Sequence, residues 1–256
     1  MHAPPNPAPP SPSAVPSHTG DVSRVPWLLR AEGIAKSYGP TVALAPADFT
    51  VAPGESVAIM GPSGSGKSTL LLVLSGILTA DTGSVILRRS DDAGFDDLAG
   101  QSDAQRSAIR LHRFGFVFQQ GMLIPELTAT ENVMVPLLLA GVQRRLAQPR
   151  AERELDQLGL SELGERRIGQ LSGGQAQRVA VARALVTGPS IVFADEPTGA
   201  LDSHTAEEVL DTLLGTAWGT GPEPRRAVVL VTHSAEIAAR CDRIVRVRDG
   251  RIEDPA

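Results

Sequence analysis

The sequence predicts an α/β protein whose mainly parallel sheet is covered by helices on both faces. Short apolar runs alternate with helical segments along most of the chain, which is typical of this class. Some of these runs, such as "SVAIM" at 56–60 and "SIVFAD" at 190–195, have the continuous apolar character of strands buried on both faces. In addition, residues 56–60 lead into a glycine-rich loop that is followed by a leucine-rich segment.

The composition is that of an ordinary globular protein, with 42% hydrophobic residues in a chain of 256, enough for one large domain or two small ones. The longest apolar runs, 70–78 and 133–142, are shorter than the ~18–20 residues that span a bilayer, so we expect no membrane span. Residues 1–26 lack the cationic and apolar regions of a signal peptide, and a cytoplasmic location is expected. The net charge of −5 disfavours a broad nucleic-acid-binding surface.

The first 26 residues contain eight of the 20 prolines, and we interpret them as a disordered Pro-rich arm. A docking ligand for a proline-binding domain is the alternative. The chain has one cysteine, Cys241, which cannot form an internal disulfide and is expected to be a buried small apolar residue.

The elements from Trp27 to residue 120 are expected to be mostly strands. Two strand-like stretches, 27–39 and 42–55, come before the strand at 56–60, the glycine loop and a helix from about Ser68 to Leu78. The next expected elements are a strand at 83–89, a polar loop at 90–105 that leads into a short helix, and a strand at 114–120.

The second half of the chain is expected to begin with helices. Residues 125–170 carry helical signals throughout, and we assign a separate helical subdomain to about 122–172. The elements expected after it are a helix at 173–187, a strand at 190–195, a helix at 204–214, a strand at 227–232, a helix at 234–240 and a hairpin at 243–254.

The glycine-rich loop "GPSGSGKST" fits the phosphate-binding pattern G-x-x-x-x-G-K-[ST]. Its glycines let the backbone N–H groups of 64–69 turn towards a phosphate at the positive end of the following helix. Lys67 would reach the β- and γ-phosphates, and the Ser68 hydroxyl would coordinate Mg²⁺. The chain has 22 arginines but only two lysines, Lys36 and Lys67, so a lysine at this position indicates a role for a compact ammonium.

An apolar strand at 191–194 ends in two adjacent carboxylates, Asp195 and Glu196. The carboxyl edge of a parallel sheet is where ligands bind in such folds. Asp195 would hold Mg²⁺ through water, and Glu196 would polarise the water that attacks the γ-phosphate. With the glycine loop, this pair predicts a nucleoside triphosphatase and nothing narrower.

The segment "LSGGQ" at 171–175 narrows the prediction. With this segment the chain resembles, over about residues 28–256, the nucleotide-binding subunits of ATP-binding cassette (ABC) transporters. The resemblance implies a RecA-like P-loop core, an antiparallel β subdomain and an inserted α-helical subdomain, together forming an ABC ATPase domain at 27–256. It also implies ATP and Mg²⁺ as cofactors.

The resemblance assigns roles residue by residue. Catalytic roles are implied for Glu196, His233 and Gln119, of which His233 would hydrogen-bond the γ-phosphate. Metal ligands are implied at Ser68, Gln119 and Asp195. Nucleotide contacts are implied for Tyr38, which would stack on adenine, and for Gly61, Pro62, Ser63, Gly64, Ser65, Gly66, Lys67, Ser68, Thr69, Ser172, Gly173, Gly174, Gln175 and Asp202.

The resemblance also explains why one chain carries two phosphate-binding loops. Two subunits would face each other head to tail, so that "LSGGQ" of one closes over the γ-phosphate held by the P-loop of the other. The implied partners are therefore a second copy of this chain, joined through ATP, and an integral membrane permease on the inner face of the plasma membrane. No nucleic acid is expected as a partner.

Within the family, "FGFVFQQGMLIPELTATENV" and "ADEPTGALD" are similar to ATPases of lipoprotein-releasing, macrolide-exporting and antimicrobial-peptide-responsive systems. Ala200 and Ala176 depart from the Asn and Gln that are usual there. The alternative function is a non-transport cassette ATPase that acts on DNA or ribosomes. A P-loop kinase or GTPase is a third class, and it leaves "LSGGQ" and His233 unexplained.

Overall fold

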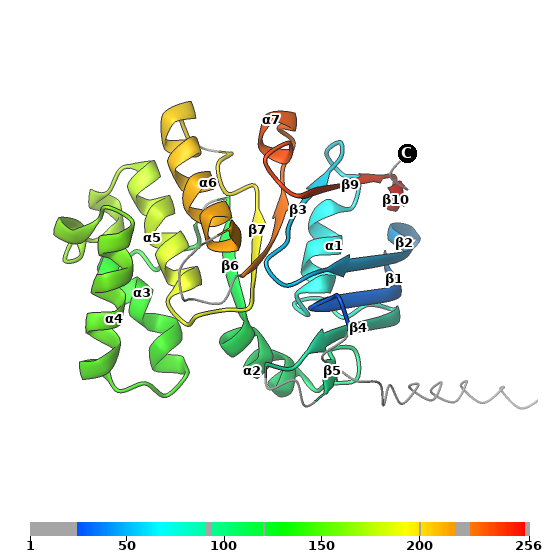
Figure 1. Ribbon diagram of the computed structural model, residues 1–256, viewed down its shortest axis with the longest axis horizontal. Helices are drawn as coiled ribbons and strands as arrows, with labels where there is room; N and C mark the ends of the chain where they lie inside the picture. Colours follow the sequence, from blue (N-terminus) through cyan, green and yellow to red (C-terminus); the bar gives the residue numbers. More distant parts are fainter. Residues whose placement is uncertain (1–24, 91–93, 120, 200, 219–225, 254–256) are drawn as a thin grey trace, which may run out of the picture.

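The computed structural model describes residues 25–90, 94–119, 121–199, 201–218 and 226–253. Most of the predicted Pro-rich arm, and Ala200, lie outside these residues. Figure 1 shows the six-stranded sheet between two layers, with α5 and α6 on one side and α1 with the second sheet on the other. This arrangement confirms the predicted α/β class.

The larger sheet has the strand order β10-β9-β3-β8-β7-β6, and all its pairs are parallel except β9 with β10. The smaller sheet, β2-β1-β4-β5, is antiparallel. The strands are β1 (Leu29–Tyr38), β2 (Thr41–Val51), β3 (Ser56–Met60), β4 (Thr82–Arg88), β5 (Phe95–Asp97), β6 (Phe114–Phe118), β7 (Ile191–Asp195), β8 (Ala227–Val231), β9 (Arg243–Arg248) and β10 (Arg251–Glu253).

Helices connect the parallel strands, because parallel strands cannot be joined by a tight hairpin turn. They are α1 (Lys67–Leu74), α2 (Asp103–Arg113), α3 (Ala129–Leu139), α4 (Arg144–Gln157), α5 (Gly173–Leu185), α6 (Ser203–Trp218) and α7 (Ala235–Ala238), with short 3₁₀ turns at Ser161–Leu163 and Ile168–Gln170. None of the helices in the described ranges is long and apolar enough to cross a bilayer. The boundaries 27–256 for the ATPase domain and about 122–172 for the helical subdomain stay predictions.

Side chains of the central strands alternate between two hydrophobic cores. On β7, Ile191 and Phe193 face the core shared with α1 and the antiparallel sheet, whereas Val192 and Ala194 face the core shared with α3 to α6. Because successive residues of a strand point to opposite faces, a strand buried on both sides must be apolar throughout. This is the physical basis of the continuous apolar runs in the sequence.

Four elements differ from their predicted form. The predicted loop at 90–105 contains a short strand, β5, which pairs with β4, and Phe95 packs its ring 5.1 Å from the Trp27 ring. Helix α1 ends at Leu74 rather than at Leu78, since Gly76 takes a left-handed φ of 64° that ends the helix. Helix α6 runs to Trp218, past the predicted end, and α7 is shorter than expected.

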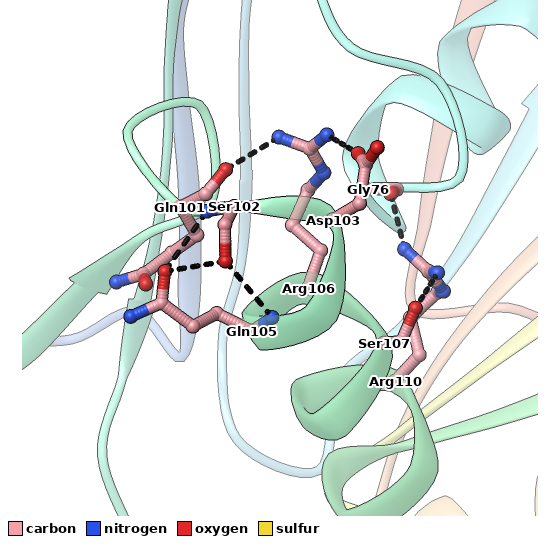
Figure 2. A network of polar contacts seen from close by, with 8 residues as sticks. All are labelled: Gly76, Gln101, Ser102, Asp103, Gln105, Arg106, Ser107 and Arg110. Atoms are coloured by element: carbon pink, nitrogen blue, oxygen red, sulfur yellow. Dashed lines mark hydrogen bonds and ion pairs between the residues drawn. The ribbon is translucent and has the colours of Figure 1, made fainter.

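Helix α2 carries a network of polar contacts on its first turns, and one hydrogen bond of this network reaches the chain just after α1 (Figure 2). A capping box starts the helix: the Ser102 hydroxyl accepts from the Gln105 amide, and the Gln105 side chain accepts from the Ser102 amide at 2.9 Å. One turn further on, Arg110 donates to the Gly76 carbonyl at 2.6 Å. Helix α2 is therefore attached to the helix that begins at the P-loop.

The C-terminal hairpin of β9 and β10 contacts the P-loop through a backbone hydrogen bond. The turn residues Asp249 and Gly250 have φ values of 48° and 74°, the left-handed pair that an Asp-Gly hairpin turn requires. The Gly250 amide donates to the Ser65 carbonyl at 2.9 Å, and its carbonyl accepts from the Ala45 amide at 2.7 Å. The hairpin predicted at 243–254 is confirmed for its described residues, and it joins the P-loop to β2.

The single cysteine is partly buried rather than fully buried. Cys241 packs against the core of α3 to α6, and burial raises the pKa of its thiol to about 11, assisted by the negative charge of Asp242.

Candidate active site

The P-loop lies between β3 and α1 in a conformation that glycine adopts readily and other residues do not. A Cβ on Gly61 would lie 2.0 Å from the Val247 carbonyl oxygen, and one on Gly66 would lie 2.3 Å from that of Ala43. Gly64 and Gly66 also have left-handed φ values of 77° and 102°. The loop therefore requires glycine at these positions.

The Lys67 side chain folds back onto the P-loop and binds two of its carbonyls. Its ammonium donates to the Gly61 carbonyl at 2.9 Å and to the Pro62 carbonyl at 2.8 Å, and the residue is only 7% exposed. The loop also buries the Ser65 hydroxyl, which has no hydrogen-bond partner among the described residues. A phosphate oxygen in the loop would provide a partner for both groups, so the residues fit a bound nucleotide phosphate.

Two oxygen-bearing side chains from distant parts of the chain, Ser68 and Asp195, meet beside the P-loop. The Ser68 hydroxyl donates to Asp195 Oδ1 at 3.3 Å. Burial raises the pKa of Asp195, and the neighbouring Glu196 carboxylate raises it further, whereas the Ser68 hydrogen bond and Lys67 oppose the shift. A carboxylate and a hydroxyl are ligands that suit Mg²⁺, and a bound cation would compensate the cost of burying the Asp195 charge.

Glu196 lies opposite His233 at the carboxyl ends of β7 and β8. His233 Nδ1 is 3.6 Å from Glu196 Oε1, and the His233 side chain is 69% exposed. The Glu196 backbone is left-handed, with φ of 46°, and its amide donates to the Val231 carbonyl at 3.0 Å. Left-handed backbone is costly for a residue with a Cβ and is often found at functional sites.

Gln119 follows the end of β6, and its side chain lies near Glu196. A Cβ on Gly199 would lie 3.0 Å from Gln119 Nε2 and 3.4 Å from Glu196 Oε2, so both side chains border this glycine. The structure thus brings together Lys67, Ser68, Gln119, Asp195, Glu196 and His233 at one edge of the sheet.

Tyr38 lies at the end of β1, with its side chain 51% exposed. Its ring centroid is 6.0 Å from the Lys36 ammonium, and Lys36 donates to Asp81 at 2.6 Å. The adjoining strand β2 contacts the P-loop through Ala43, as described above. Tyr38 is therefore a half-exposed aromatic residue on the hairpin beside the loop, as a base-stacking role would need.

The segment 171–175 forms the beginning of α5. Ser172 caps the helix: its hydroxyl accepts from the Gln175 amide at 3.2 Å, and its amide donates to Gln175 Oε1 at 2.9 Å. The amides of Gly173 and Gly174 lie in the first turn, where a helix has no internal acceptors. The S-x-x-Q spacing of Ser172 and Gln175 is the sequence signature of this capping box.

Asp202 is linked to this segment through one residue. Its carboxylate accepts from the Thr205 amide at 3.1 Å and from the Thr205 hydroxyl at 2.8 Å, which caps α6. A Cβ on Gly174 would lie 2.2 Å from Thr205 Cγ2, so α5 and α6 touch at their first turns.

Residues 171–175 are not part of the P-loop site within one chain. Among the described residues, no hydrogen bond or ion pair joins 171–175 to 61–69, and α1 and α5 lie on opposite sides of the sheet (Figure 1).

The sequence model of the family described as "ABC transporter" matches residues 44–199. The chain belongs to this family. The match spans the P-loop, Gln119, the 171–175 segment and both carboxylates, whereas Tyr38 and His233 lie outside the matched residues.

Among the curated ABC relatives, the lipoprotein-releasing system ATP-binding protein LolD 1 of Rhodospirillum rubrum is 42% identical over 228 residues, which cover 88% of this chain and 96% of the relative. LolD of Porphyromonas gingivalis is 41% identical, over 87% of this chain and 97% of the relative. The macrolide export ATP-binding/permease protein MacB 2 of Aeromonas hydrophila is 40% identical over 89% of this chain. The chain spans 34% of the length of that last relative.

Two solved ABC structures have the same fold. The ATP-binding cassette MJ0796, in a dimeric post-hydrolysis state bound to ADP and Pi, matches with a TM-score of 0.77 and 37% identity, over 88% of this chain and 96% of that chain. The cbiO1 protein of Clostridium perfringens, part of the ABC transporter complex cbiONQ, matches with a TM-score of 0.76 and 27% identity, over 90% and 88% of the two chains.

Sequence reasoning missed several residues that shape this ABC site. Gly199 makes room for Gln119, Gly250 supports the P-loop, and Arg183 binds the chain just after Gln119. Gly250 carried a signal for its hairpin turn but none for its contact with the P-loop. Arg183 carried a signal of its own, because an arginine within the apolar end of a helix at 179–185 is costly to bury without acceptors.

Proposed function

We propose that this chain binds ATP with Mg²⁺, hydrolyses it, and thereby drives a membrane permease. The observation that carries the proposal is the meeting of Ser68, Asp195, Glu196, His233 and Gln119 above the P-loop, although they come from four separate parts of the chain. The family membership and the ADP- and Pi-bound MJ0796 cassette support it.

Each group has a role that its position suits. Lys67 would exchange the carbonyls of Gly61 and Pro62 for phosphate oxygens, because these acceptors hold it within the loop. Ser68 and Asp195 would hold Mg²⁺, which neutralises phosphate charge when bound. Glu196 would take the proton of the attacking water.

The positioning of that water would fall to the neighbours of Glu196. Gln119 borders Glu196 across Gly199, and His233 faces Glu196 at 3.6 Å. Both side chains can reach a water or a phosphate oxygen held beside the Glu196 carboxylate, which is the geometry that general-base catalysis needs.

A second copy of the chain would complete each site. The free amides at the start of α5 form an anion-binding helix end, yet they lie apart from the P-loop of their own chain. A head-to-tail dimer would place them over the γ-phosphate of the opposite copy, and ATP would join the two. The dimeric MJ0796 structures support this arrangement.

The permease would dock in an apolar groove bordered by α2, β6, α3 and α5. The groove has a volume of about 610 Å³, and Phe116, Phe118 and Leu111 line it. On its rim Leu139 is 71% exposed and Ile77 is 41% exposed. The printed names of the LolD and MacB relatives support a transport partner. The chain would then lie peripherally on the inner face of the plasma membrane.

A fusion of two copies tests the composite sites. With Lys67→Ala in one copy and Ser172→Arg in the other, one site carries both changes and the second is intact, so turnover up to about half that of the unchanged fusion is expected. The matched control carries both changes in the same copy, which damages both sites and should abolish turnover. Equal activity of the two fusions contradicts the proposal.

The groove has its own test in mild detergent. Leu139→Glu should prevent co-purification of the integral membrane protein that accompanies the unchanged chain, because it places a charge in the apolar groove. Leu146→Glu is the control, since Leu146 is 49% exposed on α4 and does not line the groove. Retention of the membrane protein by Leu139→Glu excludes this docking surface.

A further inference from the structure

The chain bends at Gly121 and Met122, shortly after Gln119. Gly121 and Met122 both have left-handed backbone, with φ of 65° and 47°. A left-handed conformation is unfavourable for Met122, which has a Cβ and is 65% exposed, so hydrophobic burial does not hold it in place. Another interaction must stabilise the bend.

That interaction comes from α5. Arg183 Nη2 donates to the Gly121 carbonyl at 2.6 Å, and Arg183 Nη1 donates to the Met122 carbonyl at 2.7 Å. Burial lowers the pKa of the Arg183 guanidinium, and no carboxylate contributes to that shift. One planar guanidinium thus binds two consecutive carbonyls, which a lysine could not do with the same geometry.

Helix α5 also holds the chain just before Gln119. Gln177, which is 4% exposed, donates from Nε2 to the Phe118 carbonyl at 3.1 Å. A Cβ on Gly121 would lie 3.4 Å from Gln177 Oε1 and 3.4 Å from Ala180 Cβ. Gln119 is therefore fixed on both sides by a single helix, the one that begins with Ser172.

We propose that Arg183 is a positioning residue for hydrolysis, which keeps Gln119 beside Glu196 by binding the carbonyls of Gly121 and Met122. The inference rests on the proposed ATPase function. Arg183 also lines the apolar groove, so a segment bound there would contact the side chain that holds the bend after Gln119.

Kinetics of Arg183→Gln test this role. We expect kcat to fall about 10- to 100-fold, the scale of a small displacement of a catalytic group, while ATP affinity measured with a fluorescent ATP analogue is unchanged. Arg183→Lys should recover part of the loss because it can bind one of the two carbonyls. Arg178→Gln is the control on the same helix, since Arg178 donates to Leu158 instead, and it should keep the kcat of the unchanged chain.

A double-mutant cycle separates positioning from general damage. If Arg183 acts through Gln119, then adding Arg183→Gln to Gln119→Ala should cause no further loss of kcat. Multiplicative losses, or a normal kcat in folded Arg183→Gln, overturn the proposal.

Hydrogen exchange gives a readout that does not need turnover. The Gly121 amide donates to the Phe118 carbonyl at 2.8 Å, and its exchange should accelerate in Arg183→Gln but not in Arg178→Gln. Unchanged exchange contradicts the role of Arg183. Absence of turnover in the unchanged protein, with its exchange pattern as expected, would count against the proposed ATPase function alone.

Discussion

The Asp195 carboxylate lies 3.3 Å from the Ser68 hydroxyl, although 127 positions separate the two residues in the sequence. This contact joins the end of β7 to the first turn of α1. It places a partly buried carboxylate beside the P-loop, where its charge is costly without a cation.

Asp195→Asn should stabilise the nucleotide-free chain at neutral pH. The pKa of Asp195 is raised above its ordinary value of 3.8, so the folded state disfavours the charged form. Below that value the group is neutral in both folded and unfolded chains and the substitution has little effect. The gain in melting temperature should appear as the pH rises above about 4 and be complete once the pH exceeds the raised pKa of the folded state.

Thermal melts from pH 4 to 8 measure this gain. Asp81→Asn is the control with the opposite sign, because Lys36 and the Ser37 amide lower the pKa of Asp81, and it should reduce the melting temperature at neutral pH. A lower melting temperature for Asp195→Asn at pH 8 contradicts the prediction.

Glu196→Gln should bind ATP but hydrolyse it at least ~100-fold more slowly, the scale of losing a general base. The amide keeps the shape of the side chain but cannot take a proton from water. The substituted chain should accumulate as an ATP-bound dimer in gel filtration with Mg-ATP. Turnover close to that of the unchanged chain would assign the general base to another residue.

Lys67→Arg should be nearly as harmful to turnover as Lys67→Ala. Lys67 is 7% exposed, its ammonium donates to the carbonyls of Gly61 and Pro62, and a broad guanidinium does not fit there. Steady-state ATPase assays of both variants, with ATP binding measured separately, decide this. If Lys67→Arg keeps normal turnover, a positive charge alone is sufficient.

Gly199→Ala should slow hydrolysis about tenfold with little change in stability, because the added methyl group displaces the flexible end of Gln119 rather than backbone. Gly215→Ala in α6 is the matched control. A Cβ added at Gly215 has no neighbouring atom within 4 Å. The substitution should therefore raise the free energy of unfolding by about 1 kcal/mol, the helix preference for Ala over Gly, without affecting kcat. Equal kcat values for the two variants would show that Gln119 tolerates displacement.

Cys241 should react slowly with iodoacetamide in the folded chain. Its thiol pKa of about 11 leaves almost no thiolate at pH 7.5, and the thiolate is the nucleophile. Mass spectrometry after timed alkylation should show much faster labelling in denaturant, where the pKa returns to about 9. Equal rates with and without denaturant would show that the thiol is accessible and ionised in the folded chain.

The sequence by itself determined the local features of this protein. The P-loop, the Asp-Gly hairpin and the doubly buried strands depend on neighbouring residues, since backbone conformation and strand periodicity are local properties. The P-loop residues and the Asp195–Glu196 pair can be named for the same reason, whereas Tyr38, Gln119, His233 and the other candidates are named through the resemblance to the family. Their roles, apart from the family itself, remain predictions.

Only the tertiary structure decided which of these residues meet. The strand order β3-β8-β7-β6 brings Ser68 to Asp195 and Gln119 to Glu196, and no periodicity in the sequence specifies that order. Strand β5 forms by pairing with β4, with Phe95 packed against Trp27, and Arg183 contacts Met122, which is 61 residues away. Such contacts depend on how elements pack, so their energies arise between segments that the sequence alone leaves unpaired.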